Sequence, residues 1–242
     1  MTLDVSKPEL RYGCPAADQI LFNRFYTVGY SYYFRQAKWT LEIVEPGKHI
    51  NDVDDDVTRQ NNFRPDFRLP QRFRGDLSDY RRSGFDRGHL VASANQDQTA
   101  LQNSETYLLS NMSPQAPQFN RGIWKDLEGE IRAKNDEPDI YETYVMAGPI
   151  FDFEHRTRFI GQADNNGIKI PIPSHFFKCV LVERKSGKLE MWAFEFENKD
   201  LDGRPADFVT STSAIEQRAG INIWPNLFGD NIEAEKKQIN RW

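Results

Sequence analysis

Alternating hydrophobic and polar positions predict several β-strands along the chain. In residues 38–45 the apolar side chains Trp39, Leu41 and Ile43 alternate with polar neighbours, which is typical of a strand buried on one face. Hydrophobic runs bounded by turn residues indicate four more strands, at residues 140–147, 168–173, 176–183 and 189–197. We expect the run at residues 140–147 to end at Gly148 and Pro149. The prolines at positions 171 and 173 place the run at residues 168–173 at a sheet edge or a bulge.

Helical periodicity is confined to fewer segments. Residues 122–135 carry apolar side chains at the spacing of one helical face. Ser213 and Glu216 have the spacing of a capping box, which predicts a short helix that ends near Gly220. The charged residues 231–242 are expected to form a terminal helix.

Strands that follow one another, with helical stretches between them rather than in regular alternation, indicate an α+β protein. We expect a mainly antiparallel central sheet flanked by helices. No internal repeat or low-complexity linker interrupts residues 1–242, so a single domain is predicted. Hydrophobic residues make up 38% and charged residues 28%, which indicates a folded globular chain rather than a disordered one. No window approaches 18 uninterrupted apolar residues, which argues against a membrane span or a membrane partner.

The amino terminus and the cysteines bear on the compartment. The first residues lack a basic region followed by an apolar run, so no signal peptide is predicted and an intracellular protein is the default. A secreted or periplasmic protein whose signal has been removed would give the same pattern. Cys14 and Cys179 lie far apart and form no CxxC pair, which excludes a zinc cage of thiolates and leaves a disulfide between them open.

The distribution of charge is more informative than its sum. The net charge of -5 by itself argues against a nucleic-acid partner, because phosphate binding normally needs a basic surface. Residues 59–87, however, hold eight arginines and four aspartates. Arginine binds phosphate through two parallel hydrogen bonds. A solvated charged loop is the alternative interpretation, and the position of the run directly before a histidine motif favours phosphate.

That motif is DRGH, in which Asp86 and Arg87 precede Gly88 and His89. A histidine with a pKa of about 6.5 can be neutral at working pH and accept a proton. No comparable pattern surrounds the other three histidines, at positions 49, 155 and 175.

A stripe of four residues is predicted along one side of the helix downstream of the motif. Asn120, Trp124, Glu128 and Arg132 follow one another at intervals of four, the spacing of one helical side. The alternative is an exposed Glu128–Arg132 ion pair with a capping asparagine. Eight helical residues span about 12 Å, so Glu128 is expected to act on any ligand of Asn120 through a water molecule.

Four blocks of the sequence together resemble the DNA/RNA non-specific endonucleases with a ββα-metal (His-Me finger) site. This family includes the sugar-non-specific bacterial nucleases and mitochondrial endonuclease G. The blocks are TRQNNFRPD (58–66), SGFDRGHL (83–90), SNMSPQAPQFNRGIWKDLE (110–128) and VMAGPIF (145–151). They span most of residues 58–151 in the order and spacing of the family.

The resemblance implies a role for each matching residue. His89 is similar to the general base, and Asn120 to the single protein ligand of Mg²⁺, for which Mn²⁺ is a substitute. Glu128 resembles the acid that orients a water on the metal. The resemblance further implies phosphate-stabilising residues and supporting residues around the site: Arg59 and Arg87 for the first, and Asp86, Asn111 and Arg132 for the second.

The chain departs from the family pattern just after the histidine. Many relatives read Leu-Ala-Pro-Ala-Ala-Asp there, and this chain has Ala92 in place of the proline and Asn95 in place of the aspartate. Neither change removes a residue with an implied catalytic role.

These residues together predict phosphodiester hydrolysis in DNA and RNA with little sequence preference, leaving 5′-phosphate and 3′-hydroxyl ends. Neutral His89 would take a proton from the attacking water, and the metal would stabilise charge on the phosphate. Two alternatives remain: a catalytically inactive nucleic-acid-binding relative, and a phosphodiesterase acting on a small or lipid substrate. The resemblance leaves open a homodimer and a protein inhibitor as partners, and the preference between DNA and RNA.

Overall fold

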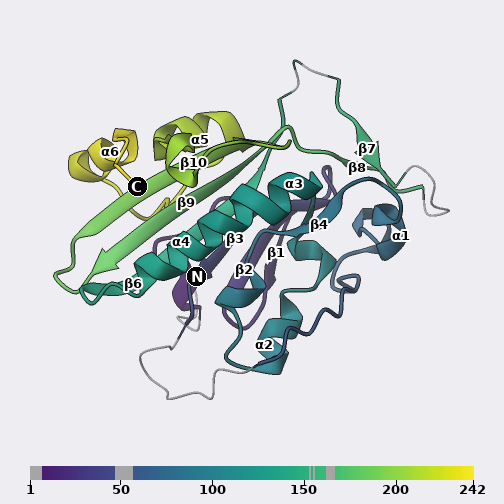
Figure 1. Cartoon of the computed structure of the whole chain (residues 1–242), viewed down its shortest axis with the longest axis horizontal. Helices are drawn as coiled ribbons and strands as arrows, with labels where there is room; N and C mark the ends of the chain where they lie inside the picture. Colours follow the sequence, from purple (N-terminus) through teal and green to yellow (C-terminus); the bar gives the residue numbers. More distant parts are fainter. Residues whose placement is uncertain (1–6, 47–56, 153, 155, 162–166) are drawn as a thin grey trace.

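The computed structural model of the chain describes residues 7–46, 57–152, 154, 156–161 and 167–242. At its centre lies a seven-stranded sheet in which all neighbouring strands are antiparallel (Figure 1). The strand order is β1 (Gln19–Phe22), β2 (Tyr26–Ser31), β3 (Gln36–Ile43), β6 (Ile140–Ile150), β9 (His175–Arg184), β10 (Leu189–Glu197) and β11 (Val209–Thr210). The prediction of an α+β protein with a mainly antiparallel central sheet is confirmed.

Two small ribbons and several helices complete the described structure. The ribbons pair β4 (Asp86–His89) with β5 (Met112–Gln115), and β7 (Phe159–Ile160) with β8 (Ile170–Pro171). The helices are α1 (Leu77–Tyr80), α2 (Ala100–Glu105), α3 (Pro117–Phe119), a π-helical turn (Asn120–Trp124), α4 (Lys125–Asn135), α5 (Thr212–Ala219) and α6 (Asp230–Lys237). Short 3-10 helices lie at Pro8–Leu10, Gln71–Phe73, Ser93–Asn95, Leu109–Asn111 and Pro205–Phe208.

Hydrophobic side chains on both faces of the sheet form two separate cores. Successive strand residues point to opposite faces, so Val180 of β9 joins the core beneath α4 while Leu181 joins the core on the other face. Leu127 and Ile131 cover the first face from α4, which runs along the sheet in Figure 1. Ile215 of α5 covers the second face. The sheet therefore provides a rigid base on which α4 is held.

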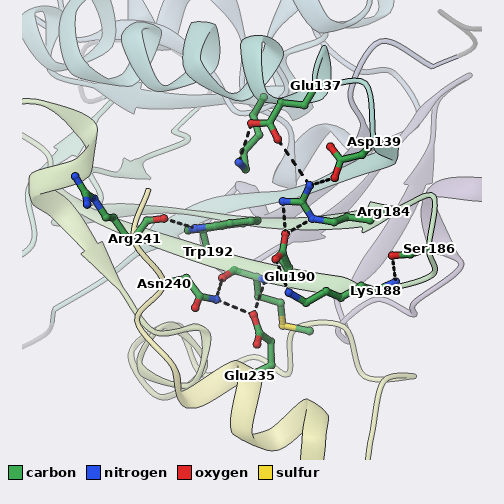
Figure 2. Close-up of polar contacts among 12 residues, drawn as sticks. Glu137, Asp139, Arg184, Ser186, Lys188, Glu190, Trp192, Glu235, Asn240 and Arg241 are labelled. Carbon is green, nitrogen blue, oxygen red and sulfur yellow. Dashed lines mark hydrogen bonds and ion pairs between the residues drawn. The ribbon is translucent and has the colours of Figure 1, made fainter.

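The carboxyl end of α4 is tied to β9 and β10 by charged and polar contacts (Figure 2). The Arg184 guanidinium pairs with Asp139 and with Glu137 in the turn after α4, and its Nε donates to Glu190 Oε2 at 2.6 Å. The backbone carbonyl of Arg241 accepts a hydrogen bond from Trp192 Nε1 at 3.1 Å. The contacts of Arg184 fix the end of α4 against β9 and β10, and the last residues of the chain are held against β10.

Most predicted elements are found close to the expected residues. The strands predicted at residues 38–45, 176–183 and 189–197 are confirmed as β3, β9 and β10. The run at 168–173 forms only the two-residue strand β8, in the small ribbon and outside the main sheet. The predicted terminal helix ends at Lys237 as α6, and residues 238–242 continue in non-helical form.

The predicted end of β6 at Gly148-Pro149 is wrong, because the strand continues to Ile150. Pro149 lies opposite Phe176 of β9, whereas β3 pairs with β6 only as far as Ala147. Beyond that residue no register pair joins β6 to β3 in the described structure, so the missing N–H of Pro149 breaks no ladder hydrogen bond there.

The predicted capping box of α5 is also wrong. The helix begins two residues earlier, and its N-cap is Ser211, whose Oγ accepts from Ala214 N at 3.1 Å. Glu216 instead accepts hydrogen bonds from Ile223 N and Lys236 Nζ, both at 2.8 Å. The predicted end is confirmed, because Gly220 follows the helix in the left-handed conformation with φ 64°.

The open question of a disulfide is answered by the structure. Cys14 is half-buried, Cys179 is buried, and both are free thiols whose pKa values are raised by burial. His49 and His155 lie outside the described residues. Among the helices of the described part of the chain, none has the length and apolarity needed to cross a membrane.

Candidate active site

The DRGH residues form β4, and β5 leads through α3 and the π-helical turn into α4, giving a ββα arrangement. A Cβ atom on Gly88 would lie 2.0 Å from Gln115 Oε1, so glycine at this position leaves room for the buried Gln115 side chain. Trp124 Nε1 donates to the backbone carbonyl of His89 at 3.0 Å. This hydrogen bond joins the histidine strand directly to the helix that begins at Asn120.

The ribbon and the helix border a cavity of about 500 Å³. It is lined by all but one of the site residues predicted from the sequence: Arg59, Asp86, Arg87, His89, Asn120, Glu128 and Arg132. Arg121 and Lys125 line it as well and were missed by sequence reasoning. Both are exposed, and the only available signal was their positive charge beside Asn120.

Asn111 is the predicted residue that does not line this cavity. Its side chain is fully buried, and its Oδ1 accepts from Val91 N at 3.0 Å. Its Nδ2 donates to the backbone carbonyls of Val91 and Thr106, at 3.0 and 2.9 Å. Asn111 therefore clamps the chain immediately after His89 and acts on the site through the backbone.

The His89 imidazole is held in an aromatic and cationic environment. Its ring makes edge contacts with the rings of Phe63 and Tyr107, at centroid distances of 5.6 and 4.9 Å. Burial, reinforced by the charges of Arg59 and Arg87, lowers the pKa of His89 to about 3. The imidazole is therefore neutral at neutral pH, and a neutral imidazole can accept a proton.

The Asp86 carboxylate organises the other side of the cavity. Its Oδ2 accepts from Asn120 Nδ2 at 3.0 Å, which leaves Asn120 Oδ1 as the amide atom available to a ligand. Arg121 binds both carboxylate oxygens, through Nε and Nη2 at 2.8 Å each. Asp86 thus orients the asparagine and is itself neutralised by an arginine.

The donor set in the cavity fits a hard cation that keeps most of its water. One amide oxygen from Asn120 and one carboxylate from Glu128 face the same cavity. Across the described ranges there is no cluster of three or more His, Cys, Asp or Glu residues that could enclose a metal ion. Mg²⁺ is characteristically bound by one or two protein oxygens together with several waters.

Two arginines approach the cavity from the loop and strand beside the histidine. Arg59 Nε donates to Tyr107 Oη at 2.6 Å, and the Arg87 guanidinium lies 4.1 Å from the centroid of the Phe63 ring. Neither guanidinium pairs with a carboxylate among the described residues. Aromatic contacts therefore hold both cations in place while leaving N–H donors for an anionic ligand.

Glu128 is paired across the core. Its Oε1 lies 3.4 Å from Nζ of Lys178 on β9, a buried ammonium that also sits 4.1 Å from the centroid of the Trp124 ring. The alternative of a Glu128–Arg132 ion pair is therefore not found. Arg132 Nη1 instead donates to Asn95 Oδ1 at 2.9 Å.

The predicted stripe of four helix residues is only partly correct. Trp124 is 1% exposed and packs in the core, whereas the other three residues line the cavity. Gly122 has φ -103° and ψ -115°, outside the helical range, so the helix is not continuous between Asn120 and Trp124. The four-residue spacing therefore fails across this kink.

Comparisons with known proteins agree with this geometry. The family described as DNA/RNA non-specific endonuclease matches residues 6–230. Endonuclease G, mitochondrial, of Caenorhabditis elegans is 31% identical over 237 residues, which cover 93% of this chain and 74% of the relative. The human protein of the same name is 30% identical over 225 residues, which cover 90% of this chain and 73% of the human protein. The solved structure of the EndoG/EndoGI complex has a chain that matches with a TM-score of 0.82 at 28% identity, covering 94% of each chain.

Proposed function

Because the chain belongs to the DNA/RNA non-specific endonuclease family, we propose that it is a Mg²⁺-dependent endonuclease acting on DNA and RNA with little sequence preference. The observation that carries this proposal is the single cavity shared by a neutral histidine, an oriented asparagine and two arginines that pair with no carboxylate in the described part of the chain. Contacts from arginine to phosphate carry no direct sequence information. The geometry therefore suits a nucleic-acid backbone of any sequence.

Each residue has a distinct role in the proposed reaction. Neutral His89 removes a proton from the attacking water, a contribution of about 10²- to 10⁴-fold for a well-placed base. Arg59 and Arg87 bind the phosphate oxygens and stabilise the charge that develops on them. Asn120 Oδ1 would hold Mg²⁺, which when bound supplies positive charge beside the phosphate and the departing 3′ oxygen. Cleavage leaves 5′-phosphate and 3′-hydroxyl ends.

The remaining predicted residues position these groups. Asp86 fixes the amide of Asn120. Glu128, which is held by Lys178, would contact a bound ion through water. Arg132 lines the rim of the cavity beside Glu128, anchored by Asn95. Mn²⁺ is expected to substitute for Mg²⁺, because both prefer oxygen ligands.

We extend the proposal to partners and compartment on the basis of the relatives. In the solved EndoG/EndoGI complex EndoG is inhibited, so a protein inhibitor is proposed for this chain as well. Relatives named as mitochondrial nucleases favour an intracellular location. A homodimer stays a prediction from the family resemblance.

Supercoiled plasmid DNA and a matched RNA test the proposal directly. We expect nicking with Mg²⁺ that is abolished by EDTA, and loss of cleavage in His89→Ala and Asn120→Ala without loss of folding. His175→Ala is the matched control, because His175 lines a different cavity. No metal-dependent nicking between pH 6 and 9 would refute the enzyme and favour an inactive nucleic-acid-binding protein.

Salt dependence separates the polymer from a small or lipid substrate. Binding to several phosphates of a polyanion releases counterions, so the cleavage rate should fall steeply as salt increases. A flat salt response combined with hydrolysis of a small phosphodiester would contradict the polymer as substrate.

A further inference from the structure

A second cavity adjoins the catalytic one and shares a wall with it. Its volume is about 390 Å³, and we call it the flanking groove. The groove is lined by Leu77, Tyr80, Arg81, Phe85, Asp86 and Arg87. The last two of these also line the catalytic cavity, so the two cavities adjoin at Asp86 and Arg87.

The groove carries a cation that the catalytic site does not use. Arg81 is exposed, and its guanidinium makes no hydrogen bond or ion pair with any residue in the described part of the chain. The acid in the shared wall does not counter this charge, because both oxygens of Asp86 are already bonded to Arg121 and one of them to Asn120 as well. The groove is therefore suited to an anionic group such as a phosphate.

An aromatic ring lines the same groove. Phe85 is half-buried, and its inner part packs with Tyr80 and Leu77 in the third hydrophobic cluster. The Arg158 guanidinium lies 5.6 Å from the centroid of the Phe85 ring, so the ring is supported by a cation as well as by apolar contacts. A ring beside a free guanidinium is the arrangement that binds a base together with its phosphate in single-stranded nucleic acids.

We propose that the flanking groove binds an unpaired nucleotide adjacent to the scissile phosphate, with its phosphate on Arg81 and its base against Phe85. This inference rests on the proposed function of the neighbouring cavity. A base that remains stacked in a duplex cannot reach the ring, because stacking on a protein side chain requires the base to leave its neighbours. The groove therefore predicts tighter binding of single strands than of duplexes.

Neighbouring arginines in the chain provide a matched pair of variants. Arg81 lines the groove, whereas Arg82 is also exposed but does not line it. On a short single-stranded DNA with Mg²⁺, Arg81→Gln is expected to raise KM about tenfold with little change in kcat. The slope of log(kcat/KM) against log(salt) should decrease by about one phosphate contact. Arg82→Gln should behave as the wild type.

Outcomes at Arg81 separate this inference from the proposed function. If the wild-type protein does not cleave nucleic acid with Mg²⁺, the proposed function itself is refuted. If the wild type cleaves, and Arg81→Gln and Arg82→Gln have equal KM values and equal salt slopes, the flanking groove does not bind the substrate. The proposed nuclease function would then still stand. Thermal unfolding of both variants checks that each remains folded.

Phe85→Leu tests the base contact while keeping the apolar packing of the ring. We expect its KM to rise on the single strand and to stay near the wild-type value on a duplex of the same sequence. Phe85→Tyr retains the aromatic face and should keep the wild-type KM on both substrates. An equal rise on single strand and duplex in Phe85→Leu, or none on either, would show that no unpaired base contacts the ring.

Discussion

Replacing Glu42 with glutamine should remove a large part of the pH dependence of folding stability. The Glu42 carboxylate is 1% exposed at the end of β3 and accepts hydrogen bonds from Asn95 Nδ2 and Gln96 Nε2, both at 3.0 Å. Burial raises its pKa to about 7, against the opposing effects of these two bonds and of the Lys178 charge. Asn95 also binds Arg132, so the buried acid is linked to the rim of the catalytic cavity.

The sign and size of the effect follow from the two states of the carboxyl group. In the unfolded chain a glutamate ionises at about pH 4.3, whereas in the folded protein Glu42 keeps its proton until about pH 7. The stabilisation is therefore fully present below about pH 4.3 and is lost as the pH rises through 7. A shift of more than two pKa units, at about 1.4 kcal/mol per unit, corresponds to a loss on the order of 3 kcal/mol. Glutamine has no such proton to lose.

Urea unfolding followed by circular dichroism at pH values from 4 to 8 measures this difference. We expect the free energy of unfolding of Glu42→Gln to gain on the order of 3 kcal/mol relative to the wild type across that range. Glu233→Gln on α6 makes the same chemical change at an exposed position and should run parallel to the wild type. Parallel curves for Glu42→Gln as well would show that folding does not shift the pKa of this carboxyl group.

Three further substitutions test separate contacts. Gly88→Ala should lower the free energy of unfolding by about 1–3 kcal/mol through overlap with Gln115, and Gln115→Ala in the same chain should recover part of the loss in urea unfolding. Tyr107→Phe keeps the ring but removes the hydroxyl that accepts from Arg59 Nε, so kcat/KM for plasmid nicking should fall about tenfold. Unchanged kinetics would show that the hydrogen bond between Tyr107 and Arg59 does not contribute to cleavage. Lys178→Met removes the buried partner of a carboxylate, and thermal unfolding should show a loss of about 3 kcal/mol; a neutral result would mean that the pair adds no net stability.

The elements that could be predicted from the sequence are those in which local pattern and burial coincide. Residues 189–197 form β10 at the predicted bounds, because the strand pairs with β9 along its whole length. The end of β6 could not be predicted from Gly148 and Pro149, because it depends on β6 continuing to pair with β9 after its pairing with β3 has ended. The N-cap of α5 is Ser211 rather than the predicted Ser213. Glu216 bonds to Ile223 N and Lys236 Nζ further along the chain instead of completing a capping box with Ser213.

The sequence by itself determined which chemical groups the site contains and their order along the chain. His89 and Asn120 could be identified from motif residues and spacing. They lie on adjoining elements, His89 in β4 and Asn120 at the start of the π-helical turn. Only the tertiary structure decided how these groups are paired. Glu128 meets Lys178 rather than Arg132, and Asn95 joins Arg132 to a buried glutamate. Ion pairs and hydrogen bonds between elements depend on how side chains approach in space, and sequence spacing within one helix does not contain that information.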